Sequence, residues 1–306
     1  MPHAADRLAA AINRSGSPVC VGLDPVFDKL PDAVRAAHLE PIAAIKEFSL
    51  GVLRALAGPP GATTPLAPAI KFQSACYERY GAHGVAALES CIAAARELNL
   101  IVVLDAKRGD IGISAEHYAA SAFSRMHADW LTVSPYLGPD TLEPYLSSAA
   151  NPNSARGIFV LVRTSNPGSD AFQSQQLADG RTIAELMADA VAKLGQSGPG
   201  TTGTSGLTNV GAVVGATKAS DAAALRHRMP NTILLIPGYG AQGGAAADIQ
   251  AMLRPNRDRA NPGTSGVLVT ASRSVIYAFT PTQTDWQTAV ASAAAKLADE
   301  IRTIIA

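Results

Sequence analysis

The chain has 306 residues, with 25 basic and 25 acidic residues for a formal net charge of zero, and 47% of it is hydrophobic. This neutral balance gives no electrostatic footprint for nucleic acid or an anionic membrane, so any bound anion must be met by a local site. Three cysteines without a C-x-x-C pair argue against a disulfide framework or a zinc site.

The first 18 residues predict a short amphipathic helix with internal charges, and they do not resemble a signal peptide. No run approaches the roughly 18 apolar residues that a membrane span needs. We therefore expect a soluble, cytoplasmic protein that binds neither nucleic acid nor membrane.

Eight short apolar runs then predict strands. Each run is nearly continuous in apolar residues, which is typical of strands covered on both faces in a parallel sheet. Amphipathic helical patterns separate the runs, the clearest at 39–56, 91–100, 181–195 and 284–305. The predicted strands are 18–24, 67–72, 101–107, 129–135, 157–164, 211–217, 232–238 and 266–272.

Eight strands alternating with helices predict a (β/α)8 TIM barrel, forming a single domain over residues 1–306. A doubly wound sheet shares the alternation and is the alternative, but eight evenly weighted repeats favour the barrel. Residues 195–211 are rich in Gly, Ser and Thr and predict a flexible surface loop. Strands of the same character continue on both sides, so we place no domain boundary there.

Polar residues gather at the C-terminal ends of the first five predicted strands, the face on which a TIM barrel carries its active site. Strand ends also become polar simply because they meet water. Charged residues ending three successive strands favour a functional site over that explanation. The strand-end residues are Asp24, Lys71, Asp105, Lys107, Ser134, Thr164 and Ser165.

The segment LDAKRGDIG, residues 104–112, brings two carboxylates close to one ammonium. Asp105 and Lys107 are two apart on a strand and share a face, and Asp110 follows in the loop. Such a pair interacts by roughly 4 kcal/mol at ~4 Å and an effective dielectric near 20, before desolvation, so we expect Lys107 to stay protonated. A fixed ammonium there suits stabilising or protonating a carbanion formed where an anionic group leaves. A structural ion pair, or a metal site with Asp105 and Asp110 as ligands, is the alternative.

A phosphate site is predicted at the ends of the last two strands. PGYGAQGG, residues 237–244, contains the G-x-G-x-x-G dinucleotide fingerprint, but too little chain follows it for a dinucleotide-binding domain. Its backbone N–H groups can instead meet a single phosphate, with Arg273 after the eighth strand as the cation. TIM barrels often build a phosphate site from these two loops.

Together these motifs resemble the orotidine 5'-phosphate decarboxylases, and most closely their longer bacterial (type 2) branch. D-x-K-x-x-D alone is shared with related barrel enzymes, and its combination with TSNPG and GAQGG is far more specific. The other matching segments follow the family's order: VGLDP (21–25), AIKFQSACYERYG (69–81), FVLVRTSNPGS (159–169), PGYGAQGG (237–244) and SRSVIYA (272–278).

The resemblance implies a homodimeric barrel with sites shared at the subunit interface, and neither metal nor organic cofactor. It implies decarboxylation of orotidine 5'-monophosphate to UMP, the last step of pyrimidine nucleotide synthesis. Lys107 would protonate C6 of the pyrimidine, and Asp105 would lie beside the substrate carboxylate. Asp110 would reach into the partner's site and complete an alternating network with Lys71.

The resemblance also implies substrate contacts. Asp24 matches a ligand of the ribose hydroxyls and Ser165 a contact of the pyrimidine. Gln242 and Arg273 match the phosphate ligands, helped by the backbone of Gly243.

Three further contacts are implied nearby. Ile111 would pack on the base from the partner chain, and Pro167 belongs to the TSNPG motif. Ser114 stands where the family often has threonine and keeps the hydroxyl. The alternatives are another phosphate-binding barrel lyase or epimerase acting on a sugar phosphate, often with a divalent metal, and a nucleotide-binding protein without turnover.

Overall fold

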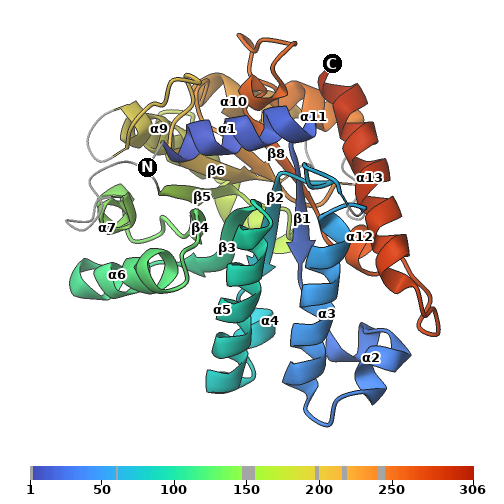
Figure 1. Cartoon of the computed structure of the whole chain (residues 1–306). Helices are drawn as coiled ribbons and strands as arrows, with labels where there is room; N and C mark the ends of the chain where they lie inside the picture. The colour runs from blue at the N-terminus through green and yellow to red at the C-terminus, as the bar shows by residue number, and fades with distance from the viewer. Residues whose placement is uncertain (1–2, 60, 147–155, 197–199, 216–218, 240–244) are drawn as a thin grey trace.

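Eight parallel strands close into a barrel in chain order, and β1 pairs with β8, in the computed structural model (Figure 1). The structure describes residues 3–59, 61–146, 156–196, 200–215, 219–239 and 245–306. This closure confirms the predicted TIM barrel and rules out the doubly wound sheet, in which edge strands stay unpaired. The strands are β1 Val19–Leu23, β2 Ala69–Gln73, β3 Ile101–Arg108, β4 Trp130–Val133, β5 Gly157–Arg163, β6 Val210–Val214, β7 Leu234–Ile236 and β8 Val267–Ala271.

All eight predicted runs contain a strand, although the predicted end of the sixth, at 216–217, lies outside the described residues. The longer helices are α1 Ala4–Ser15, α3 Pro41–Leu56, α5 Gly81–Glu97, α6 Gly112–Ala119, α9 Ile183–Gln196, α10 Ala219–Arg228, α11 Ala246–Met252 and α13 Trp286–Ile305. Short helices are α2 Asp32–Ala36, α4 Ala75–Glu78, α7 Glu143–Leu146, α8 Asp170–Gln173 and α12 Arg273–Ile276. A π-helical stretch, Ala120–Arg125, extends α6, and single 3₁₀ turns lie at Phe27–Lys29, Pro139–Leu142, Pro167–Ser169 and Pro262–Thr264.

Two hydrophobic clusters explain why the strands are apolar on both faces. Alternate residues of each strand point outward and pack against the surrounding helices in the larger cluster. The other residues point into the barrel, where the rings of Trp130 and Phe159 stack at 4.5 Å between centroids. This filled interior is a packed core and not a pore.

Helix α1 closes the N-terminal end of the barrel, where Figure 1 shows it in blue across the strands. Leu8 and Ile12 on its apolar face are buried in the inner cluster. The amphipathic pattern at the N-terminus therefore marks a plug, and the opposite, C-terminal end of the barrel is left to carry a site.

The described part of the Gly/Ser/Thr-rich segment is tied to α1. The backbone N–H groups of Thr204 and Ser205 each donate to the Asp6 carboxylate at 2.8 Å, and Leu207 packs into the inner cluster. Burial opposes ionisation of Asp6, but these hydrogen bonds outweigh it and lower its pKa to about 2. The flexibility that the composition predicts for 195–211 stays a prediction. Thr204, Ser205 and Leu207 within this segment do contact the rest of the fold.

Candidate active site

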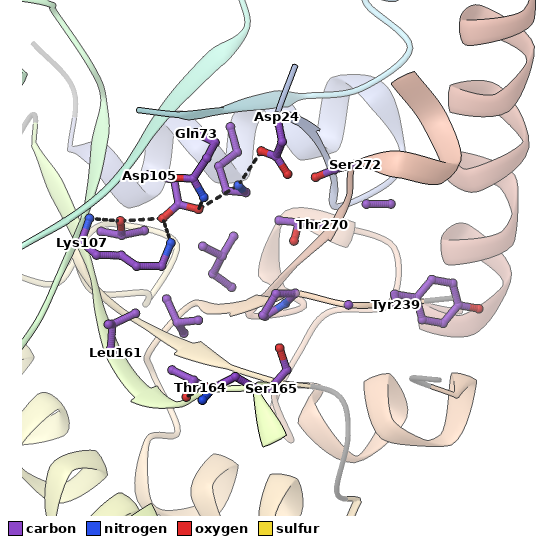
Figure 2. A pocket seen from close by; sticks show the side chains of 18 of the residues that line it. Asp24, Gln73, Asp105, Lys107, Leu161, Thr164, Ser165, Tyr239, Thr270 and Ser272 are labelled. Carbon is purple, nitrogen blue, oxygen red and sulfur yellow. Dashed lines mark hydrogen bonds and ion pairs between the residues drawn. The ribbon is translucent and has the colours of Figure 1, made fainter. Parts of the chain in front are cut away.

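A cavity of about 610 Å³ opens at the C-terminal ends of the strands (Figure 2). Every strand except β4 and β6 contributes a residue at or just beyond its C-terminal end, while Thr132 and Val213 reach it from within those two strands. The lining residues are Asp24, Lys71, Gln73, Asp105, Lys107, Thr132, Leu161, Thr164, Ser165, Asn166, Gln173, Val213, Leu235, Pro237, Gly238, Tyr239, Thr270, Ala271, Ser272 and Arg273.

Asp105 is the centre of the charged part of this cavity. Its Oδ2 accepts from Lys71 Nζ at 2.8 Å, and its Oδ1 accepts from Lys107 Nζ at 2.7 Å. Gln73 Nε2 adds a bond to Oδ2 at 3.3 Å, and Thr132 Oγ1 adds one to Oδ1 at 2.9 Å. Each carboxylate oxygen therefore faces one ammonium and one neutral donor, which Figure 2 shows by dashed lines.

The two ammonium groups keep Asp105 ionised although it is buried. Burial alone would raise the pKa of the Asp105 carboxyl, but the charges of Lys71 and Lys107 outweigh it and hold the pKa well below its usual range. Burial would likewise lower the pKa of Lys71, but Asp105 and Asp24 hold it above its usual value. At neutral pH the site therefore holds a carboxylate and an ammonium group that both stay charged.

The two lysines differ in their access to a ligand. The Lys71 side chain is 8% exposed and bridges Asp105 and Asp24, whose Oδ1 lies 3.4 Å from Nζ. The Lys107 side chain is 47% exposed and has one acceptor, Asp105, among the described residues. An ammonium carries three donors, so Lys107 can present the others to a molecule in the cavity.

The loop that carries Asp24 is clamped by one tyrosine. Tyr277, just after α12, donates its hydroxyl to the Asp24 carbonyl at 3.1 Å and accepts the Val26 N–H at 2.8 Å. The two bonds lie on either side of Pro25, so Tyr277 holds the backbone directly after Asp24, whose carboxylate lies beside Lys71.

The loop after β5 is held in a similar way by Gln173 of α8. Gln173 Oε1 accepts the Thr164 N–H at 2.8 Å, and its Nε2 donates to Thr164 Oγ1 at 2.9 Å. This pairing holds the TSN segment, and with it Ser165, against the cavity.

Seven of the predicted residues come together in this cavity: Asp24, Lys71, Asp105, Lys107, Thr164, Ser165 and Arg273. Arg273 and Lys107 therefore line one space, as a single phosphorylated substrate touching both would require. Gln242 and Gly243 lie outside the described residues, so their predicted phosphate contacts stay predictions.

Five other predicted residues do not line the cavity: Asp110, Ile111, Ser114, Ser134 and Pro167. Asp110 lies in the turn before α6, where its Oδ1 accepts the N–H of Ile111 at 2.9 Å. The resemblance assigns Asp110 and Ile111 to the partner's site, so their position outside their own cavity leaves that assignment open. Pro167 is exposed at the start of a 3₁₀ turn, and its predicted substrate contact has no support from this cavity.

Gln73 and Thr132 contact Asp105 and were not predicted. A signal for both was present in the sequence, because residues two apart on a strand share a face. Gln73 is two residues beyond Lys71, and Thr132 is two beyond the inward-facing Trp130. Alternation within the strands would therefore have found them once the inward face was known.

Two other kinds of site find no support among the described residues. Within the ranges given above, no group of three or more His, Cys, Asp or Glu side chains could hold a metal ion. Over the same ranges, no helix combines the length and apolar character of a membrane span.

Comparison with known proteins identifies the family. Residues 62–284 match the model of the orotidine 5'-phosphate decarboxylase / HUMPS family. The chain is 38% identical to the orotidine 5'-phosphate decarboxylase of Rhodopirellula baltica, over 97% of this chain and 98% of that protein. It is 41% identical to the enzyme of the same name from Cupriavidus necator, over 89% of each. The structure of Leishmania donovani OMP decarboxylase superposes with a TM-score of 0.74 and 32% identity, covering 98% of this chain and 97% of that one. The chain therefore belongs to the orotidine 5'-phosphate decarboxylase / HUMPS family.

Proposed function

We propose that this protein is a carboxy-lyase that converts orotidine 5'-phosphate to UMP and CO2, the last step of pyrimidine nucleotide synthesis. Relatives named for this activity match over nearly the full length of the chain. The single observation that carries the proposal is the Asp105 carboxylate held between the ammonium groups of Lys71 and Lys107, in the cavity that Arg273 also lines.

The reaction breaks the bond between C6 and its carboxylate and leaves an electron pair on C6. Lys107 Nζ stabilises this developing carbanion by its charge and then gives it a proton, and solvent restores the proton to Lys107. CO2 departs as a neutral molecule. Atoms and charge balance with one proton drawn from solvent through Lys107, and the carbanion forms beside a cation that is already in position.

The remaining charges divide between reaction and binding. Asp105 lies beside the substrate carboxylate, so loss of CO2 removes one of two neighbouring negative charges. Lys71 keeps Asp105 ionised and in place. Arg273 binds the phosphate with Gln242 and the backbone of Gly243, far from the reacting carbon, and this binding energy orients the base.

A second copy of the chain covers the apolar surface beside the cavity. Large apolar side chains are exposed on the segments that follow β3, β4 and β5, with Ile111 60% exposed and Tyr136 76% exposed. The rings of Tyr136 and Phe172 lie 6.0 Å apart, and exposed apolar side chains that gather in this way are typical of an interface. The members of this apolar surface are Ile111, Ile113, Tyr118, Tyr136, Leu137 and Phe172.

The same surface carries the residue that the site lacks. Asp110 lies directly before Ile111 and outside its own cavity. In the dimer it enters the partner's site and completes the alternating network of Lys71, Asp105 and Lys107.

The three cysteines are free thiols, which fits the reducing cytoplasm as the place of action.

Substitution of Lys107 tests this function. We expect Lys107→Ala to lower kcat for orotidine 5'-phosphate by at least about a thousandfold, because the general acid and the cation are lost together. The control is Lys296→Ala, which removes an exposed lysine on α13 and should leave kcat unchanged. Near-normal decarboxylation by Lys107→Ala would end the proposed mechanism. Activity of the wild type on pentulose phosphates, lost with a chelator, would favour the sugar-phosphate alternative.

A further inference from the structure

One hydroxyl joins the two charged residues of β3 by a second route. Thr132 Oγ1 donates to Asp105 Oδ1 at 2.9 Å and accepts the backbone N–H of Lys107 at 2.9 Å. Lys107 Nζ donates to the same Asp105 oxygen at 2.7 Å. Lys107 is thus tied to one carboxylate oxygen twice, directly through its ammonium and through Thr132 from its backbone.

The backbone explains why such a tie is needed. Between β3 and β4 the register passes from Leu104 opposite Leu131 to Arg108 opposite Val133, so β3 advances four residues while β4 advances two. Lys107 lies in this bulge with a φ of +48°, a left-handed conformation that non-glycine residues rarely adopt. A bulge disturbs the backbone ladder, and here the Thr132 hydroxyl serves as the acceptor for the Lys107 N–H.

We propose that Thr132 is a positioning residue that sets where the Lys107 ammonium points. The inference rests on the proposed role of Lys107 as the proton donor and adds what holds that donor in place. Thr132 is 1% exposed and its hydroxyl uses both its proton and a lone pair on the β3 bulge. Strained conformations of this kind persist only where the surroundings over-determine them.

Removing the hydroxyl should therefore affect turnover more than folding. Valine has the shape of threonine without the hydroxyl, so Thr132→Val leaves the Lys107 N–H without its side-chain acceptor. Asp105 keeps Lys71 and Gln73 on its other oxygen and stays in the site. The bulge and the Lys107 side chain then relax together, away from the geometry that proton transfer needs.

Steady-state kinetics with orotidine 5'-phosphate and binding of UMP separate position from affinity. We expect Thr132→Val to lower kcat by about 10- to 100-fold, the scale of an ångström-sized misplacement, and to change the Kd of UMP by less than about threefold. Thr132→Ser keeps the hydroxyl and should recover kcat to within about fivefold of the wild type. Thr208→Val is the matched control: it deletes a buried hydroxyl that bonds Val210 O at 2.9 Å at the far end of β6, and kcat should not change.

Two results would overturn the proposal. One is a kcat for Thr132→Val within about twofold of the wild type, because a misplaced donor must cost turnover. The other is a kcat for Thr132→Ser as low as that of Thr132→Ala, because serine keeps the hydroxyl and the role would then belong to the methyl group. This comparison of Thr132→Ser with Thr132→Ala also tests the proposal if Thr132→Val does not fold. Lys107→Ala in the same assay distinguishes the failures: if it retains turnover, the proton-donor role fails, and if it is inactive while Thr132→Val is not impaired, only the positioning role fails.

Discussion

Replacing Lys71 by methionine tests how strongly the buried ion pair holds the active site together. Methionine keeps an unbranched chain of similar length but removes the ammonium that lies 2.8 Å from Asp105 Oδ2 and 3.4 Å from Asp24 Oδ1. Both side chains of the closer pair are less than a tenth exposed, at 8% for Lys71 and 9% for Asp105. The substitution therefore leaves a buried carboxylate with less compensation.

The expected loss follows from the partners that remain. Removing one member of a buried pair costs about 3–5 kcal/mol when the other charge is left uncompensated. Asp105 still accepts from Lys107, Gln73 and Thr132, so we expect the lower end of that range, about 3 kcal/mol. The loss should shrink as the pH falls below about 4, because protonation of Asp105 then relieves the unpaired charge.

Urea unfolding at pH 7 measures the free energy of unfolding, and a double-mutant cycle isolates the interaction energy between Lys71 and Asp105. The cycle combines Lys71→Met with Asp105→Leu, which keeps the branching at Cγ and removes the charge. If the pair is coupled as its geometry indicates, the double variant should be more stable than the sum of the two single losses predicts, by at least about 1.5 kcal/mol. Additive losses, or a cost of Lys71→Met below about 1 kcal/mol, would refute the reasoning that the charge of Lys71 offsets the burial of Asp105.

Two further predictions concern the proposed interface and the closed end of the barrel. Mixing Lys107→Ala and Asp110→Ala subunits, under conditions in which subunit exchange is proven, should restore activity to about a quarter of all sites. Random pairing makes half of the dimers heterodimers, and each heterodimer has one intact site. No recovery would mean that Asp110 does not act across an interface. Asp6→Asn should destabilise the protein above pH 4 and have little effect at pH 2, because the pKa of Asp6 falls from 3.8 to about 2 on folding and its stabilisation is lost as pH falls through that window. Thermal unfolding of both proteins between pH 2 and pH 7 measures this difference, and a destabilisation that stays constant over the range would contradict it.

The sequence predicts the barrel well because parallel strands must be apolar on both faces. All eight runs stand out from the helical patterns between them, and Asp24, Lys71, Asp105 and Lys107 mark the functional end of the barrel. Strand spacing along the chain thus predicts which charges converge. It does not predict the pairing between neighbouring strands, on which finer contacts depend.

The bulge in β3 shows this limit. LDAKRGDIG reads as a regular strand followed by a loop, and nothing in it announces that β3 gains two residues on β4. The left-handed backbone of Lys107 and its bond to Thr132 arise only from that register. The exposure of Ile113 and Tyr136 is likewise not evident from the sequence pattern and is seen only in the folded chain.

The plug formed by α1 limits how substrate and products reach and leave the cavity. With Leu8 and Ile12 seated against the filled interior, the cavity communicates with solvent only at the strands' C-terminal mouth, as far as the described residues define it. Substrate, CO2 and the solvent that supplies the proton therefore all pass through this one opening. In the proposed mechanism CO2 leaves the carbanion through this same opening, so proton transfer from Lys107 competes with re-formation of the C6–carboxylate bond.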